Sequence, residues 1–271
     1  MALRPAPGEV HCWSVRLDVP PETFASLHAT LASDERSRSE RLRFERDRRR
    51  FVVARGALRD VLGRYVGMRP DLIAFAYNAF GKPGLSPALG SRLRFNLSHS
   101  ADLALIAVAA EADVGVDVEW VPQEAEGARP WYAEIARCFF SAAEIDHCGT
   151  VPSHLRAQAF FSCWTVREAY LKALGRGLGD GPEEYRGSWS FFGLQPAPGY
   201  VGTLAVEGAG WRLGHWLWPA GPWPAPRPRG AVAKPAPPRT PRPRTPRRRP
   251  PSLPGASRAR STTTASRSQR T

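Results

Sequence analysis

An alternating acidic segment, Gly115-Val116-Asp117-Val118-Glu119, lies within an otherwise apolar run from residue 114 to residue 120. Apolar residues that alternate with polar ones are typical of a β-strand with one buried face. In a strand, residues i and i+2 project to the same side, so Asp117 and Glu119 would project together. A D-x-E pair by itself also occurs on solvated strand edges, so its meaning depends on the rest of the chain.

A second acidic segment lies further along, in Trp164-Thr165-Val166-Arg167-Glu168-Ala169-Tyr170-Leu171-Lys172. In a helix, residues i and i+4 share a face, so Glu168 and Lys172 would project together. Three carboxylates beside a lysine form a site for a hard cation and a phosphate, because Mg2+ is usually held by one or two carboxylates together with substrate phosphates. The plainer alternative is that Lys172 is an ordinary ion-pair partner of Glu168.

Composition indicates a globular protein of the cytoplasm. Hydrophobic residues make up 42% of the chain, yet no uninterrupted run is long enough to span a membrane. The first nine residues lack the apolar core of a signal peptide. The cysteines show no C-x-x-C spacing, so we expect small core residues in a reducing compartment and no zinc site; they are Cys12, Cys138, Cys148 and Cys163.

The excess of basic charge is confined to residues 219–271. The whole chain has 38 Lys+Arg against 25 Asp+Glu, and this segment holds 13 of the basic residues, none of the acidic ones and 14 of the 27 prolines. Such a composition cannot bury enough apolar surface to fold, so we predict a disordered tail. In order of preference, it is an altered or non-native C-terminus such as a reading-frame shift, a solvated extension, or an arm that binds nucleic acid.

Periodicity along the preceding 218 residues predicts a mixture of strands and helices. The predicted strands are 10–17, 73–77, 93–97, 103–109, 114–120, 188–194, 201–206 and 211–217. The predicted helices are 21–31, a basic stretch 33–50, 47–66, 135–140, 141–148 and 155–174. Ser141 and Glu144 fit a capping box, and Gly175 lies where a helix-ending glycine is expected. A body of this size favours two subdomains, residues 1–112 and 113–218.

Five short motifs follow one another along this body: F-G-K-P (80–83), F-N-L-S-H-S (95–100), G-V-D-V-E (115–119), F-F-S-x-x-E (139–144) and W-x-x-x-E-A-x-x-K (164–172). In this order the chain resembles the 4'-phosphopantetheinyl transferases of the surfactin-synthetase-activating (Sfp) type over roughly residues 10–218. The resemblance implies an α+β fold made of a pseudo-twofold pair of similar α/β subdomains, with the active site in the cleft between them. It also implies a monomer, because the second half takes the place of a partner subunit.

The activity implied by the resemblance is transfer of 4'-phosphopantetheine from coenzyme A, the co-substrate, to a serine of an apo acyl carrier protein or peptidyl carrier protein. Fatty-acid, polyketide and nonribosomal peptide synthases all use such carriers. The serine hydroxyl attacks the β-phosphate, and adenosine 3',5'-bisphosphate leaves. Positioning and charge neutralisation dominate such reactions, and Mg2+, or Mn2+ in its place, would stabilise charge on the leaving phosphate.

Positions that match the family motifs give the acidic part of the implied site. Asp117, Glu119 and Glu168 match the metal ligands. Glu168 also matches a role in deprotonating the carrier serine, directly or through a metal-bound water. Lys172 matches the lysine that contacts the pyrophosphate, and Arg167 replaces a lysine that is usual in the family. Because arginine keeps the charge but changes reach and donor geometry, we expect a supporting contact there.

Further matching positions give the implied coenzyme A contacts. Ser98 and His99 match a Ser-His pair on the phosphates, Lys82 matches a lysine near the nucleotide, and Arg50 matches the arginine on the 3'-phosphate. The plainer alternatives are a packed histidine, a turn lysine and a solvated row of arginines. Register alternatives to Arg50, and weaker candidates, are Arg48, Arg49, Arg36 and Arg41.

Two rival functions come from different classes. The chain could be a catalytically impaired binding protein whose basic tail docks nucleic acid, although the retained acidic triad argues against this. It could also be a metal-dependent hydrolase that cleaves a pyrophosphate with a positioned water in place of the carrier serine.

Overall fold

The computed structural model describes residues 3–122, 132–177, 185–218, 230–232 and 234–235 of the 271-residue chain. The α-helices in these ranges are α1 (Pro21–Thr30), α2 (Ser33–Glu40), α3 (Glu45–Val66), α4 (Tyr132–Phe139), α5 (Ala142–Thr150) and α6 (Arg156–Leu174). The strands are β1 (Glu9–Arg16), β2 (Phe75–Tyr77), β3 (Pro83–Leu85), β4 (Arg94–Ser100), β5 (Leu103–Ala109), β6 (Val114–Trp120), β7 (Trp189–Leu194), β8 (Tyr200–Glu207), β9 (Arg212–Trp218), β10 (Gly230–Val232) and β11 (Lys234–Pro235). No helix in the described ranges is both long and apolar enough to cross a membrane.

Most predicted elements lie near their predicted positions, with two differences. The basic stretch 33–50 is not one helix, because it breaks between α2 and α3 at residues 41–44. The strand predicted to end at residue 97 continues through Ser100, which lies opposite Leu103 in the antiparallel pair β4–β5. The predicted capping box is confirmed: Glu144 N–H donates to Ser141 Oγ (3.3 Å), and Ser141 N–H donates to Glu144 Oε2 (2.7 Å).

Each half of the chain has the same strand arrangement. Three strands run in the order β1-β5-β4 in the first half and β6-β8-β7 in the second, with neighbouring strands antiparallel. A long helix, α3 or α6, follows the first strand of each set and precedes the other two. This repetition agrees with the predicted pair of similar α/β halves, which the sequence analysis took from the resemblance.

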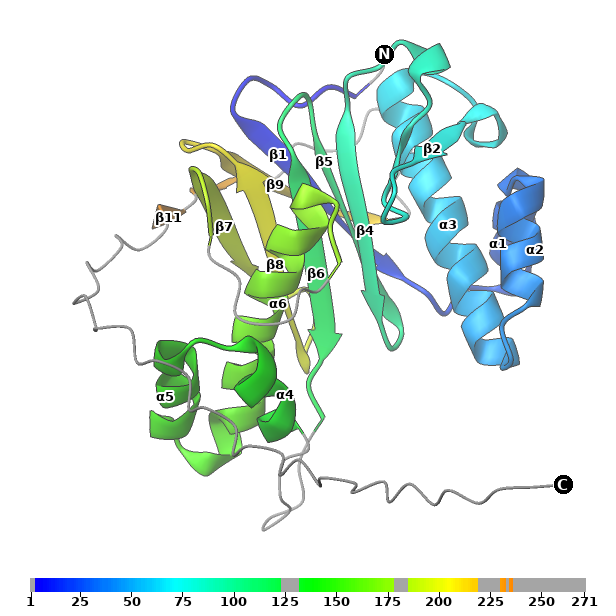
Figure 1. Ribbon diagram of the computed structural model, residues 1–271. Coiled ribbons are helices and arrows are strands. Elements are labelled where there is room, and N and C mark those ends of the chain that lie inside the picture. Colours follow the sequence, from blue (N-terminus) through cyan, green and yellow to red (C-terminus); the bar gives the residue numbers. More distant parts are fainter. Residues whose placement is uncertain (1–2, 123–131, 178–184, 219–229, 233, 236–271) are drawn as a thin grey trace, which may run out of the picture. The chain divides into compact units, whose positions relative to one another are not determined.

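Four layers follow from the packing of these elements. Apolar residues of α3 such as Leu58 and Leu62 pack on one face of the first sheet against Trp13 and Ile106. The other face of that sheet packs against the second sheet through a shared core that includes Val10, Leu105, Val116 and Leu204. Helix α6 contacts β6 and β8 on the outer side of the second sheet. Figure 1 shows β4, β5 and β6 between α3 and α6.

The last long strand crosses from one half to the other. Strand β9 lies in the range predicted for the second half, yet it pairs in parallel with β1 and extends the sheet of the first half. The predicted boundary at residue 113 therefore does not separate the two sheets completely. The sequence predicts no strand after residue 218, whereas in the structure β10 pairs with β9 and β11 pairs with β7. The rest of the predicted disordered tail lies outside the described residues.

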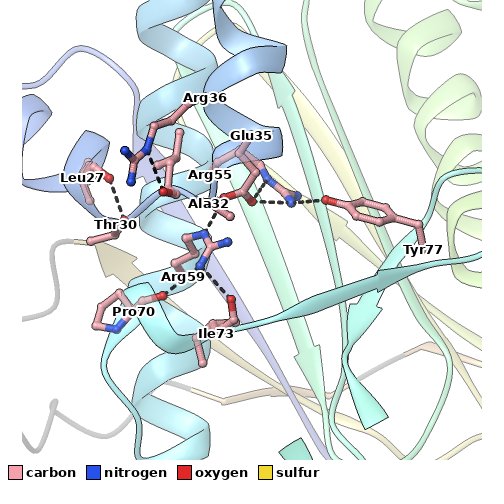
Figure 2. A network of polar contacts seen from close by, with 11 residues as sticks. Leu27, Thr30, Ala32, Glu35, Arg36, Arg55, Arg59, Pro70, Ile73 and Tyr77 are labelled. Atoms are coloured by element: carbon pink, nitrogen blue, oxygen red, sulfur yellow. Dashed lines mark hydrogen bonds and ion pairs between the residues drawn. The ribbon is translucent and has the colours of Figure 1, made fainter. Parts of the chain in front are cut away.

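A buried ion network fixes α2 on α3 (Figure 2). The Glu35 side chain is 2% exposed and accepts hydrogen bonds from Arg55 Nε (2.9 Å) and Arg59 Nε (2.6 Å). Arg59 Nη1 also donates to the carbonyl oxygens of Pro70 and Ile73, and Arg55 Nη2 donates to the Tyr77 hydroxyl. Because buried charges need such partners, the network defines how α2, α3 and β2 pack together.

Candidate active site

Strand β6 supplies two of the predicted metal ligands from one face. Val114, Val116 and Val118 point into the core between the sheets, so the alternate residues Gly115, Asp117 and Glu119 share the opposite face. Helix α6 covers this face, and it does so at very short range. A Cβ atom on Gly115 would lie 2.0 Å from the carbonyl oxygen of Ala169, so only glycine lets the helix rest on the strand here.

Strand β4 lies beside β6 and holds its acidic side chains. Ser98 Oγ donates to Asp117 Oδ1 (2.8 Å), and Ser100 Oγ donates to Glu119 Oε2 (2.8 Å). Further back along the strand, Asn96 Oδ1 accepts the Val116 N–H (3.0 Å). The side chains at 96, 98 and 100 therefore connect the sheet of the first half to the sheet of the second. From the sequence, Ser98 is predicted to contact a phosphate, whereas residues 96 and 100 have no predicted role.

Helix α6 brings a lysine to the same carboxylate. Lys172 Nζ lies 2.5 Å from Asp117 Oδ1 and also donates to Ser98 Oγ (3.1 Å). Lys172 on α6 therefore pairs with Asp117 on β6, across the interface between this helix and this strand. The plainer expectation was a pair with Glu168. Glu168 lies one turn earlier on the same helix, and its Oε1 atom is buried with no hydrogen-bond partner.

Burial raises the pKa of all three predicted ligands. For Glu119 the pKa rises to about 7, chiefly through burial and then through the negative charge of Asp117. Burial likewise raises the pKa of Asp117, against the opposing effect of Lys172, and raises the pKa of Glu168. Crowded, partly desolvated carboxylates of this kind are stabilised in their charged form by a nearby cation.

The acidic residues fit a hard divalent cation in their chemistry. Asp117 Oδ2 and Glu168 Oε1 are buried oxygens without a hydrogen-bond partner, and carboxylate oxygens are the ligands that Mg2+ prefers. In the described part of the chain, however, no three His, Cys, Asp or Glu side chains are already grouped to hold a metal ion. The Lys172 ammonium lies 2.5 Å from Asp117 Oδ1, so one oxygen of this predicted ligand is already paired with a positive charge.

Basic side chains form the other side of the site. The pKa of His99 lies below its usual value because protein atoms screen the ring from water, and because Lys172 and Arg50 place positive charge near it. Arg50 Nε is buried without a hydrogen-bond partner. Of the register alternatives, Arg48 Nε is likewise buried without a hydrogen-bond partner and lies 3.7 Å from the Glu45 carboxylate, whereas the Arg49 guanidinium lies 4.4 Å above the Phe24 ring.

Lys82 and Arg167 occupy other positions than the centre of the site. Lys82 Nζ donates to the backbone carbonyls of Ala173 (2.7 Å) and Val114 (3.2 Å), and burial lowers the pKa of this ammonium to about 8. The Arg167 side chain is 2% exposed and its Nη2 donates to Glu144 Oε2 (3.1 Å). Arg167 therefore joins α6 to the capped start of α5, a supporting contact like the one predicted for it.

An apolar pocket of about 480 Å³ adjoins the acidic residues. It opens beside Glu119 at the end of β6 and extends between α4 and α6. Aromatic rings form much of its wall, and its lining residues are Glu119, Trp120, Pro122, Ile135, Phe160, Phe161 and Trp164. The sequence analysis did not predict this pocket, because the four aromatic residues come from two elements that meet only in the fold.

Comparison with known sequences connects this geometry to a family. The family described as "4'-phosphopantetheinyl transferase superfamily" matches residues 113–217, and the family "4'-phosphopantetheinyl transferase, N-terminal" matches residues 18–111. The 4'-phosphopantetheinyl transferase HetI of Nostoc sp. (strain PCC 7120) is 36% identical over 222 residues, which cover 77% of this chain and 92% of HetI. The chain belongs to the 4'-phosphopantetheinyl transferase superfamily. It is an enzyme with that transferase activity.

Other relatives of this phosphopantetheinyl transferase are more distant. The 4'-phosphopantetheinyl transferase psf-1 of Bacillus pumilus is 31% identical over 155 residues, covering 57% of this chain and 62% of the relative. A 4'-phosphopantetheinyl transferase of Bacillus subtilis is 27% identical over 152 residues, with 56% and 63% covered. The predicted membership of the Sfp-type family is confirmed by these matches together with HetI.

Proposed function

We propose that this phosphopantetheinyl transferase uses coenzyme A as co-substrate and an apo acyl carrier protein or peptidyl carrier protein as acceptor. The contact that carries the proposal is the meeting of Asp117, Lys172 and Ser98, with partnerless buried oxygens on Asp117 and Glu168. Unpaired carboxylate oxygens beside a lysine suit a cation and a phosphate together. Mg2+, or Mn2+ in its place, is the proposed cation, held by Asp117, Glu119 and Glu168.

The proposed reaction centre lies between the acidic and the basic residues. The carrier serine oxygen forms a bond to the β-phosphorus of coenzyme A while the bond from that phosphorus to the bridging oxygen breaks, and adenosine 3',5'-bisphosphate leaves. When bound, the cation supplies charge neutralisation at the pyrophosphate. Lys172 orients and neutralises the same group, since its Nζ already lies within reach of Asp117 and Ser98.

Glu168 is the proposed acceptor of the serine proton. Its Oε1 atom is buried without a hydrogen-bond partner, so this oxygen is free to accept a proton. On the opposite side, Arg50 supplies positive charge for the remaining phosphates of the nucleotide, and His99, whose pKa lies below its usual value, supplies an imidazole N–H donor. The methyl and methylene groups of the pantetheine arm, which lie between its amide and hydroxyl groups, suit the aromatic pocket that opens beside Glu119.

Carrier loading followed by intact mass tests this proposal. The full-length protein is incubated with coenzyme A, Mg2+ and an apo carrier protein, and the carrier is then weighed. A mass gain of one phosphopantetheine arm supports the proposal. Cleavage of coenzyme A in samples without carrier would favour the rival pyrophosphate hydrolase, and neither product would favour a binding role. We also propose that the enzyme is cytoplasmic and acts as a monomer, and gel filtration with light scattering tests the monomeric state.

A further inference from the structure

The turn between β2 and β3 rests on the end of helix α6, although the two belong to different halves of the chain. Asn78 Nδ2 donates to the carbonyl oxygen of Gly175 (2.8 Å). Lys82 Nζ donates to the carbonyl oxygen of Ala173 (2.7 Å) and to that of Val114 (3.2 Å). Two side chains of one turn therefore hold both the last turn of α6 and the first residue of β6.

These contacts satisfy groups that a helix cannot satisfy by itself. The last carbonyls of a helix lack intrahelical donors. The Gly175 N–H bonds to the carbonyls of Leu171 and Lys172, and the Arg176 N–H bonds to Leu171. The carbonyl of Ala173 receives the ammonium of Lys82 instead, and a positive charge at a helix C-terminus is favourable.

The turn is shaped for this contact. The Asn78 Oδ1 atom accepts the N–H groups of Phe80 and Lys82, both at 2.9 Å, which folds the turn around that side chain. Gly175 has a φ of 66°, and a Cβ atom there would lie 2.6 Å from Asn78 Nδ2. A side chain at position 175 would therefore displace the Asn78 amide from its contact with the end of the helix.

We propose that Lys82 and Asn78 are positioning residues, which hold the last turn of α6 against β6 and so keep Lys172 opposite Asp117. The Lys82 contacts lie at the interface where α6 rests on Gly115 of β6. Lys82 joins Val114 of β6 to Ala173 of α6 directly beside this interface. Lys172 precedes Ala173 and reaches Asp117 across this interface at 2.5 Å. The effect of these residues on catalysis rests on the proposed function, whereas their contact with α6 does not.

Two variants and a charge-matched control separate this role from a direct contact with coenzyme A. Lys82→Met keeps an apolar stem and removes the ammonium, and Asn78→Ala removes the second contact. Arg92→Met is the control, because Arg92 is exposed and pairs with the exposed Glu111. Without coenzyme A, we expect the backbone amides of residues 172–176 to exchange about tenfold faster in both variants, and at the wild-type rate in the control.

Kinetics give the second arm of the experiment. We expect kcat of carrier loading to fall about tenfold in Lys82→Met, with KM for coenzyme A within about twofold of wild type. In Asn78→Ala, kcat should also fall, but by less than in Lys82→Met, and KM for coenzyme A should again stay close to the wild-type value. Lys82→Arg keeps a cationic donor and should recover part of the amide protection at residues 172–176. If Lys82→Met is poorly folded, this variant tests whether the cation holds the helix.

Two results would overturn the positioning role. Wild-type exchange at residues 172–176 in Lys82→Met and Asn78→Ala would mean that the turn does not hold the helix. A raised KM for coenzyme A in Lys82→Met, with normal kcat and normal exchange, would make Lys82 a nucleotide contact. If the wild-type protein loads no carrier, the proposed function fails, and the exchange arm still decides whether the turn holds α6.

Discussion

Replacing Asp117 with Asn removes one charge from the centre of the site and leaves its shape unchanged. Asp117 is 1% exposed, and its Oδ1 atom receives Lys172 Nζ at 2.5 Å and Ser98 Oγ at 2.8 Å. An asparagine Oδ1 still accepts both hydrogen bonds, while its NH2 group takes the place of the partnerless Oδ2 oxygen. The substitution therefore tests the charge of Asp117 and its role as a metal ligand.

The expected loss of activity follows from the contacts. A hydrogen bond to a charged group contributes about 1.5–3 kcal/mol, and each tenfold change in rate corresponds to about 1.4 kcal/mol. Weakening the contact with Lys172 alone predicts a loss of about tenfold to a hundredfold. Loss of a metal ligand adds to this, so we expect kcat/KM to fall at least about a hundredfold. Stability should fall as well, because Lys172 loses its charged partner, although burial disfavours the charged form of Asp117 and offsets part of this loss.

The assay is the initial rate of carrier loading at saturating coenzyme A and Mg2+, with the melting temperature measured in parallel. Glu111→Gln is the matched control, since it removes a carboxylate whose side chain is 67% exposed. The control should load carrier at the wild-type rate. Loading by Asp117→Asn within about threefold of wild type would refute the assignment, because neither the charge nor a metal bond at this position would then matter.

Three further outcomes are expected. If the His99 imidazole contacts the 3'-phosphate, His99→Ala should weaken coenzyme A binding about tenfold and dephospho-coenzyme A binding much less. Equal losses of affinity for the two ligands, measured by calorimetry, would mean that the imidazole contacts the pyrophosphate instead. Without metal, Glu119 binds more protons in the folded than in the unfolded state between its ordinary pKa and about 7, so the free energy of unfolding should fall as pH rises through that window. Urea denaturation of Glu119→Gln should show a shallower fall, and an equal slope would contradict the shift. Removing residues 237–271 should leave loading per folded molecule unchanged, and lost loading with an unchanged melting temperature would make that segment a docking arm.

The local parts of the site could be predicted from the sequence because they depend on short periods. The period of two in β6 places Asp117 and Glu119 on one face, and the period of α6 places Glu168 and Lys172 one turn apart. The structure agrees with both. The ion pair that forms is nevertheless between Lys172 and Asp117, because α6 lies directly on β6 at Gly115.

Contacts between distant segments could not be predicted in this way. Ser100 reaches Glu119, and Lys82 reaches Ala173, only because separate elements of the chain meet in the fold. Parallel pairing of β9 with β1 joins the two ends of the body, and no local pattern of residues encodes that partner. The three successive arginines at 48–50 look alike in sequence, and their neighbours differ because a helix turns each one in a different direction: Arg48 lies near Glu45, Arg49 over Phe24 and Arg50 near His99.

The dependence of carrier loading on Mg2+ tests the central claim most directly. The full-length enzyme is treated with a chelator, mixed with coenzyme A and an apo carrier protein, and assayed by intact mass while Mg2+ is added back. If Asp117, Glu119 and Glu168 hold a cation at the pyrophosphate, the carrier should stay unmodified in chelator and gain one phosphopantetheine arm as Mg2+ is restored. Loading at the same rate in chelator and in Mg2+ would contradict a cation-dependent site built from these three carboxylates.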